Sequence, residues 1–297
     1  MRAWSFLRRV CETGGVREQH GSVAVVGHVE WVQFAQVEQV PRAGEVVHAH
    51  EVFAEPAGGG AVAAVQLARL AGGCVLYTAL GEDAEGRRAR ERLQELGVEV
   101  HASLCAEPTR RAVTLVDAAG ERTITTFGPR LEPFAQGDAA GELAGADFDA
   151  VYFTAGDASA LAAVRQRTRV LVASPRARAA LGQGVQLEAL VLSGEDEIEQ
   201  REAARAEGEA ALVVSTEGAQ GGSYRSRSGE HGRWAAVEPE SELMDAYGCG
   251  DSFAAGLTYG LGRGMEIEAA LALAARCGMV CLTGRGPYEH QLRAADL

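Results

Sequence analysis

The sequence of 297 residues contains no long hydrophobic run, and this absence excludes several classes of protein. No segment approaches the roughly 18 consecutive apolar residues of a membrane-spanning helix, so we expect no membrane partner. Residues 1–20 also lack the apolar core of a secretory signal peptide. We expect these residues to form a disordered extension, or to result from a start codon placed too far upstream.

Basic side chains are scarce relative to acidic ones. The chain has 28 basic and 41 acidic residues, which gives a formal net charge of −13. Nucleic acids and anionic membranes bind basic surfaces, so we expect neither as a partner. The 6 cysteines are scattered rather than spaced like a disulfide framework. Without a secretory signal, this usage predicts reduced thiols and a cytoplasmic location.

The chain also lacks a linker rich in proline, glycine or serine, and it has no fixed-period repeat. We therefore expect a single domain over residues 21–297. Short apolar runs alternate with helical patterns along this range. That alternation predicts an α/β fold, in which a mostly parallel sheet carries helices on both faces. The runs are residues 22–27, 74–79, 150–153, 170–173, 189–192 and 211–215.

Two regions have a different pattern, with apolar and polar residues alternating as in exposed antiparallel strands. The first comprises extended segments at 31–40 and 45–53, joined by a turn at 41–45. The second is a hairpin with strands at 112–116 and 122–126 around the turn 117–121.

The most informative stretch is Asp245–Gly256, a glycine turn that leads into a predicted helix. Gly248 and Gly250 permit a backbone in which successive N–H groups point at one spot, and the helix start adds its own unpaired N–H groups. An anion is therefore stabilised beside the carboxylate of Asp251. A base next to an anion pocket suits the transfer of a phosphoryl group to a hydroxyl.

This stretch resembles the C-terminal signature of the ribokinase-like (PfkB-type) carbohydrate kinases. The match covers Asp245, Gly248, Gly250 and Asp251, whereas Ala246 and Cys249 depart from the usual threonine and alanine. The resemblance implies a three-layer α/β/α sandwich with a small β lid, formed by strands at about 31–54 and 110–127. It also implies that Asp251 is the catalytic base and that the turn formed by Gly248, Cys249 and Gly250 is the anion hole.

The acceptor side resembles the family less closely. The glycine turn before residue 61 resembles the N-terminal signature and implies that Gly58 and Gly59 bind substrate, but Val62 stands where the family has an asparagine. Val32 likewise replaces an aspartate, and we predict that Glu30 takes over part of its function. Arg110 and Arg111 precede the hairpin. One of them, Arg111 in our assignment, is expected to reach the substrate, although a solvated pair explains the sequence equally well.

The nucleotide side follows the family more closely. The resemblance implies that ATP is bound by Thr216, Gly218, Gly221 and Asp245. An acidic residue after the strand at 189–192 is expected to organise Mg²⁺ through water. Glu195 and Asp196 both qualify, and our assignment is Asp196.

Three functional hypotheses remain at this point. The first is an ATP-dependent kinase that acts on a sugar or nucleoside and forms a homodimer through its lid. The second is a related binding protein without catalysis. The third, a nicotinamide-dependent dehydrogenase, is disfavoured because no Gly-x-Gly-x-x-Gly follows the first strand. We also expect the thiol of Cys249, at a helix N-terminus, to have thiolate character and to react with alkylating reagents.

Overall fold

The computed structural model of the protein describes residues 22–134 and 137–297. The extension expected at residues 1–20 therefore lies outside the described residues. Within these two ranges, no helix is long and apolar enough to cross a membrane.

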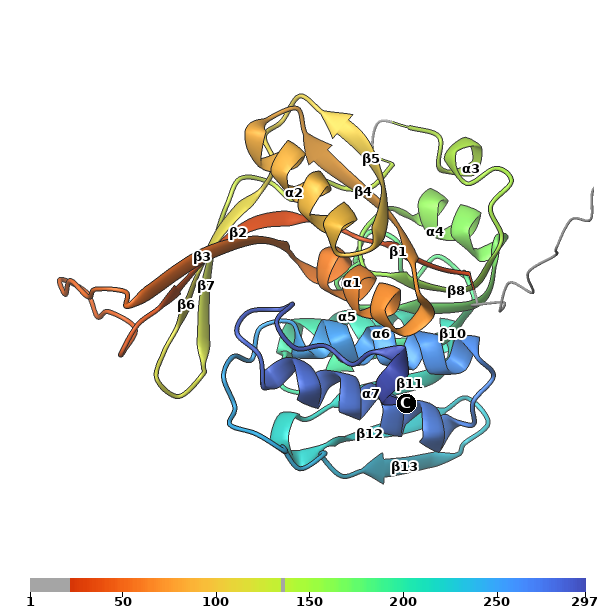
Figure 1. The fold of residues 1–297 in the computed structure, drawn as a ribbon. Helices are drawn as coiled ribbons and strands as arrows, with labels where there is room; N and C mark the ends of the chain where they lie inside the picture. Colours follow the sequence, from red (N-terminus) through yellow and green to blue (C-terminus); the bar gives the residue numbers. More distant parts are fainter. Residues whose placement is uncertain (1–21, 135–136) are drawn as a thin grey trace, which may run out of the picture.

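A nine-stranded sheet forms the centre of the main body, with helices packed around it (Figure 1). Its strand order is β13-β12-β11-β10-β9-β8-β1-β4-β5. All neighbours from β11 to β5 are parallel, whereas β12 and β13 are antiparallel. The strands are β1 (Val23–Val26), β4 (Cys74–Gly81), β5 (Val98–Cys105), β8 (Phe148–Phe153), β9 (Thr168–Ala173), β10 (Leu187–Ser193), β11 (Ala210–Thr216), β12 (Gly222–Ser226) and β13 (His231–Trp234).

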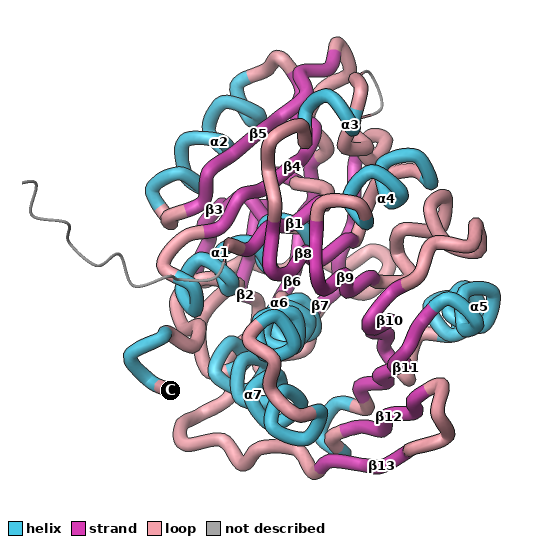
Figure 2. The backbone as a smooth tube through the Cα atoms, turned by 90° about the vertical axis from the view of Figure 1, so that its right-hand side faces the viewer, coloured by secondary structure: helices cyan, strands magenta, loops and turns pink. Residues whose placement is uncertain are grey.

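Helices cover both faces of this sheet, as Figure 2 shows. Successive residues of a strand point to opposite faces. In β1, Val23 and Val25 pack in one core cluster, whereas Ala24 and Val26 pack in another. The first cluster includes α1 (Gly59–Ala71), α2 (Ala84–Glu95), α6 (Cys249–Gly262) and α7 (Ile267–Leu282); the second includes α3 (Ala139–Glu142), α4 (Ala158–Arg165) and α5 (Glu197–Ala206). The predicted three-layer α/β class is confirmed.

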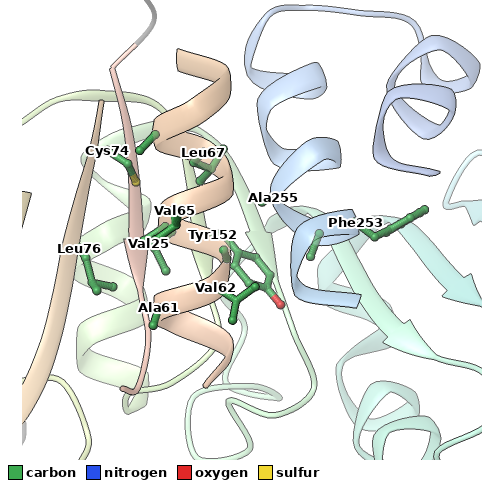
Figure 3. Packing of buried hydrophobic residues seen from close by; sticks show 14 of the residues in the cluster. Val25, Ala61, Val62, Val65, Leu67, Cys74, Leu76, Tyr152, Phe253 and Ala255 are labelled. Atoms are coloured by element: carbon green, nitrogen blue, oxygen red, sulfur yellow. The ribbon is translucent and has the colours of Figure 1, made fainter. Parts of the chain in front are cut away.

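Helix α1 is buried on almost every side, because most of its residues are small or branched apolar ones. Figure 3 shows Val65 beside Val25 of β1 and Val62 directed toward Tyr152 of β8. A methyl group on Gly248 would lie only 2.9 Å from Cγ1 of Val62. The residue that departs from the family pattern is therefore a fully buried packing residue, against which the turn before α6 rests.

A second sheet of four strands projects from the main body (Figure 1). Its order is β3-β2-β6-β7, with β2 (Glu30–Gln36), β3 (Glu51–Ala57), β6 (Arg111–Val116) and β7 (Arg122–Phe127). We call it the small sheet. β3 and β7 are its edge strands, and pairing of two copies across these edges stays a prediction.

The connection between β2 and β3 is longer than expected, because β2 ends at Gln36 rather than at residue 40. The strand expected from residue 45 begins at Glu51, and residues 37–50 form the connection from β2. The antiparallel pair β12 and β13 was not foreseen, because their segment is short and rich in glycine and polar residues.

Candidate active site

The turn before α6 is held in place by Asp245. Gly248 has a φ angle of 85°, in the left-handed region that favours glycine. Asp245 is 1 % exposed, and its carboxylate accepts the N–H of Tyr247 at 2.8 Å and that of Gly286 at 3.0 Å. Burial raises the pKa of Asp245 against the effect of these two hydrogen bonds. The carboxylate is thus used inside the protein and positions the turn, rather than facing a nucleotide as the resemblance implied.

The first turn of α6 presents unpaired donors. The N–H groups of Gly248, Cys249 and Gly250, which were predicted to form the anion hole, donate to no group in the described part of the chain, and neither does that of Asp251. Unpaired N–H groups and the positive end of the helix dipole act on the same spot. Together they form a site for an anion.

Asp251 is held from one side by an arginine that the sequence analysis did not single out. Nη1 of Arg176 lies 3.0 Å from Oδ1 of Asp251, and Nε of Arg176 lies 2.7 Å from Oε1 of Glu199. The charge of Asp251 raises the pKa of Arg176 further above its ordinary value, against the effect of burial. Within residues 22–134 and 137–297, Oδ2 of Asp251 has no hydrogen-bond partner, so this oxygen is available to a substrate.

A cavity of about 290 Å³ opens beside Asp251, between the small sheet and the main body. Most of its lining side chains are charged or titratable, and we call it the charged cavity. Gly58 and Gly59, the predicted substrate glycines, line it together with Gly248. A methyl group on Gly59 would lie 3.0 Å from Oδ1 of Asp251, so glycine permits the close approach of α1 to the base.

Glu30, which was predicted to bind substrate, lines the charged cavity. It is 6 % exposed, and its Oε1 is 3.4 Å from Nε2 of His28 and 3.2 Å from Nη1 of Arg110. Burial pushes the pKa of Glu30 upward, but the hydrogen bond and charge of His28, followed by Arg110 and Arg130, outweigh burial and leave the pKa below its ordinary value. An ionised carboxylate therefore faces the cavity.

Arg110, rather than Arg111, points into the charged cavity. Arg110 donates to Oγ1 of Thr126 at 2.8 Å in addition to its contact with Glu30. Arg111 is exposed and lines a different cavity, with Trp31 and Gln33. Adjacent strand residues point to opposite faces, and this alternation corrects the assignment of Arg111 to the substrate.

A second cavity of about 180 Å³ lies on the other side of the turn. We call it the apolar cavity, because none of the residues that line it is charged. Thr216, Gly218 and Gly221, which were predicted to bind nucleotide, all line it, together with Cys249 and Gly250. Gly221 has a φ angle of 81°, and a methyl group there would lie 2.1 Å from the carbonyl oxygen of Trp234. Only glycine fits this loop.

The predicted magnesium residue, Asp196, has a structural task. It caps α5, and its Oδ1 accepts the N–H groups of Ile198 at 2.8 Å and Glu199 at 3.1 Å. The neighbouring Glu195 is exposed, and its Oε1 lies 3.5 Å from where a methyl group on Gly218 would be. Glu195, rather than Asp196, is therefore the carboxylate beside Gly218, in the loop that lines the apolar cavity.

The thiol of Cys249 differs from the expectation of a reactive thiolate. A hydrogen bond with Cys281 and burial raise its pKa well above the ordinary value of 9.0. These two effects outweigh the helix N-terminus, which favours the thiolate. Its backbone N–H, by contrast, belongs to the anion site.

Comparison with known proteins decides the family. The chain matches the pfkB family carbohydrate kinases over residues 21–180 and 184–293. It belongs to this family. The predicted membership in the ribokinase-like (PfkB-type) carbohydrate kinase family is thereby confirmed.

Individual members of the pfkB family resemble the chain over different lengths. It is 42 % identical to acarbose 7(IV)-phosphotransferase of an Actinoplanes species over 77 residues, 26 % of each chain. It is 28 % identical to ribokinase of Dictyostelium discoideum over 109 residues, 36 % of this chain and 34 % of the relative. The aligned regions thus span about a quarter to a third of these two relatives.

The solved structures with a similar fold include two examples that match over nearly their full length. Ribokinase of Arabidopsis thaliana, complexed with ribose and ATP, has a TM-score of 0.71 at 19 % identity, over 93 % of this chain and 97 % of that one. The nucleoside kinase of Methanocaldococcus jannaschii has a TM-score of 0.68 at 16 % identity, over 92 % and 96 %.

The pfkB signatures did not reveal every residue that surrounds the site. Arg122, Arg130 and Arg176 line the charged cavity but lie outside both signatures. Arg176 follows the carboxyl end of β9, where open α/β sheets bind ligands, and that position was the available signal. Arg122 was visible only as a charged residue on a hairpin strand.

Proposed function

We propose that the protein transfers the γ-phosphoryl group of ATP to a hydroxyl of a small sugar-like molecule. One observation carries the proposal: the turn that begins α6 forms a wall of both cavities. Gly248 and Asp251 line the charged cavity, whereas Cys249 and Gly250 line the apolar one. An acceptor in the first cavity and a nucleotide in the second would meet at the unpaired N–H groups of this turn.

The residues divide the work of the transfer among them. Oδ2 of Asp251 takes the proton of the acceptor hydroxyl. Oδ1 stays hydrogen-bonded to Arg176, which fixes the orientation of the carboxylate. The N–H groups of Cys249, Gly250 and Asp251 stabilise the negative charge on the transferred group. Because the small sheet lies over the charged cavity, it limits the access of water to this group.

The described residues contain no group of three side chains that would hold a metal ion by themselves. That fits Mg²⁺, which usually keeps several waters and binds mainly through nucleotide phosphates and one or two carboxylates. We assign Glu195 to hold it through water, and among the described residues Oδ2 of Asp196 next to it has no hydrogen-bond partner. The ion would neutralise charge on the phosphates.

The test is ADP release from ATP with a panel of neutral sugars, sugar phosphates, sugar acids and nucleosides. We expect turnover with at least one acceptor and a fall of at least 100-fold in kcat for Asp251→Asn. Asp147→Asn, at an exposed position that lines neither cavity, is the matched control and should retain full activity. Tight binding of a panel member without any ADP release would instead support the non-catalytic binding protein.

A further inference from the structure

The charged cavity contains far more positive charge than the composition of the protein suggests. The chain carries a formal net charge of −13 and contains no lysine, so all 28 basic side chains are arginines. Four of these arginines line one cavity of about 290 Å³: Arg110, Arg122, Arg130 and Arg176. Among the described residues, only two carboxylates, those of Glu30 and Asp251, line it with them.

Two of the four arginines are engaged in holding the site together. Arg176 binds both Asp251 and Glu199. Arg130 donates through Nε to Glu132 at 2.6 Å and through Nη1 to the carbonyl of Arg176 at 3.2 Å. These contacts fix the direction of the two guanidinium groups, while Nη2 of Arg130 makes no hydrogen bond with the described residues.

The other two arginines retain unused donors. Nε of Arg110 is buried and has no hydrogen-bond partner in the described part of the chain, although its two terminal nitrogens contact Glu30 and Thr126. Arg122 makes neither an ion pair nor a hydrogen bond through its side chain within residues 22–134 and 137–297. A buried donor without a partner is costly, so Nε of Arg110 is available to an acceptor group on a ligand.

These arginines face the acceptor rather than the nucleotide. The apolar cavity, where the nucleotide loop lies, is lined by no charged side chain, whereas the arginines all line the charged cavity. Neutral hydroxyls need only single donors and acceptors. A guanidinium group, by contrast, presents paired donors that match the two oxygens of a carboxylate or phosphate.

We infer that the acceptor carries an anionic group, a phosphate or a carboxylate, in addition to the hydroxyl that is phosphorylated, and that Arg110, Arg122 and Arg130 bind this anion. The inference rests on the proposed kinase function, because it names the class of acceptor for the same site. Arg122 and Thr126 come from β7 and Arg110 from the residue before β6, so an anion bound here would also fasten the small sheet over the cavity.

Binding without nucleotide provides the first test, since it does not depend on catalysis. Affinity is measured by calorimetry for matched pairs: ribose with ribose 5-phosphate, fructose with fructose 6-phosphate, and glucose with glucuronate. We expect at least one anionic member to bind 10-fold or more tightly than its neutral partner. The phosphate and carboxylate pairs distinguish the two anions. Equal affinity within every pair, or no binding of any anionic member, overturns the inference.

Variants then assign the effect to the arginines. Arg122 is exposed at the rim of the cavity, so Arg122→Gln should fold normally. We expect it to weaken binding of the anionic acceptor by 10- to 100-fold and to leave the neutral partner unchanged. Arg88→Gln, an exposed arginine of α2 that does not line the cavity, is the charge-matched control and should change neither affinity. An unchanged affinity in Arg122→Gln would remove that residue from the anion site. Arg130→Gln is then the deciding second variant. If neither variant weakens binding of the anionic acceptor, the inference is wrong.

Kinetics separate this inference from the proposed function and from one alternative use of Arg122. The charge of Arg122 also acts on Cys249 and Asp245 at the turn, so it lies near the transferred group as well. If it served that group, Arg122→Gln would lower kcat with neutral and anionic acceptors alike, which contradicts the inference. If it binds the acceptor's anion, KM for anionic acceptors alone rises. Selective binding of anionic sugars with no ADP release would leave the anion site intact and refute the kinase.

Discussion

Nη1 of Arg176 lies 3.0 Å from Oδ1 of Asp251 and so joins the loop after β9 to the first turn of α6. The same guanidinium group binds Glu199, whose Oε2 accepts the N–H of Ser193 at the end of β10. The base is thereby tied to the carboxyl ends of two neighbouring strands. A positioned base needs this kind of support, because displacement by about 1 Å can cost 10²-fold in rate.

We expect Arg176→Gln to lower kcat by about 10- to 100-fold, because Asp251 loses its fixed orientation. KM for ATP should not change, since Arg176 does not line the apolar cavity. Glu199, 7 % exposed, would remain buried without its cation, and the free energy of unfolding should fall by about 1–3 kcal/mol. Steady-state kinetics and urea unfolding measure the two effects.

Arg178→Gln is the control for Arg176, because Arg178 is exposed two residues further along the same loop. Arg176→Lys should restore only part of kcat, since an ammonium group cannot bond both carboxylates with the same planar geometry. Full activity in Arg176→Gln would show that Asp251 does not need this support.

Those features of the fold that depend on local pattern were predictable from the sequence. The apolar runs located the parallel strands, and Gly248, Gly250 and Asp251 located the turn before α6. The hairpin around residues 117–121 followed from its turn residues. Each of these signals lies within a few consecutive residues, so one sequence is enough to recognise it.

The acceptor side was not predictable, because it is assembled from residues distant in the chain. Arg176 and Asp251 are 75 positions apart, and nothing local marks them as partners. The choice between Arg110 and Arg111 depended on strand register, because a shift of one residue moves each side chain to the opposite face of the sheet. Likewise, the burial of Asp245 depends on the loop that contains Gly286, which lies 41 positions further on.

Gly221→Ala tests whether the loop of the apolar cavity binds ATP. The added methyl group would collide with the carbonyl of Trp234, and the loop must shift. We expect KM for ATP to rise at least 10-fold and KM for the acceptor to stay within 2-fold. Gly229→Ala is the matched control, because Gly229 also has a positive φ angle (95°) but no atom within 4 Å of the added methyl group. Gly221→Ala should be less stable than this control by about 1–3 kcal/mol; equal KM values for ATP in the two variants would contradict the assignment.

The raised pKa of Cys249 predicts a slow reaction with iodoacetamide. At pH 7.5 the thiolate fraction is below that of an ordinary thiol with a pKa of 9.0, so labelling should be at least 10-fold slower than in the urea-unfolded chain. Mass spectrometry of the labelled peptide measures the rate. Cys249→Ala should keep kcat/KM within about 3-fold, because alanine supplies the same backbone N–H. Labelling in the folded protein at the unfolded rate would instead restore the sequence-based expectation of a reactive thiolate.

Glu30 should make the stability of the protein depend on pH in the acidic range. Its pKa in the folded state lies below the ordinary value of 4.5, so the ionised form stabilises the fold above that value. This contribution should be constant from pH 7 down to about 4.5, and it should disappear as the pH falls further through the lowered pKa. Glu30→Gln removes it, because the amide does not titrate and carries no charge for an ion pair with Arg110. We expect urea unfolding at pH 7 to show a loss of about 1–3 kcal/mol in the variant, and we expect the two proteins to converge below pH 4.5. A difference that stayed the same down to pH 3 would show that Glu30 acts through packing rather than through its charge.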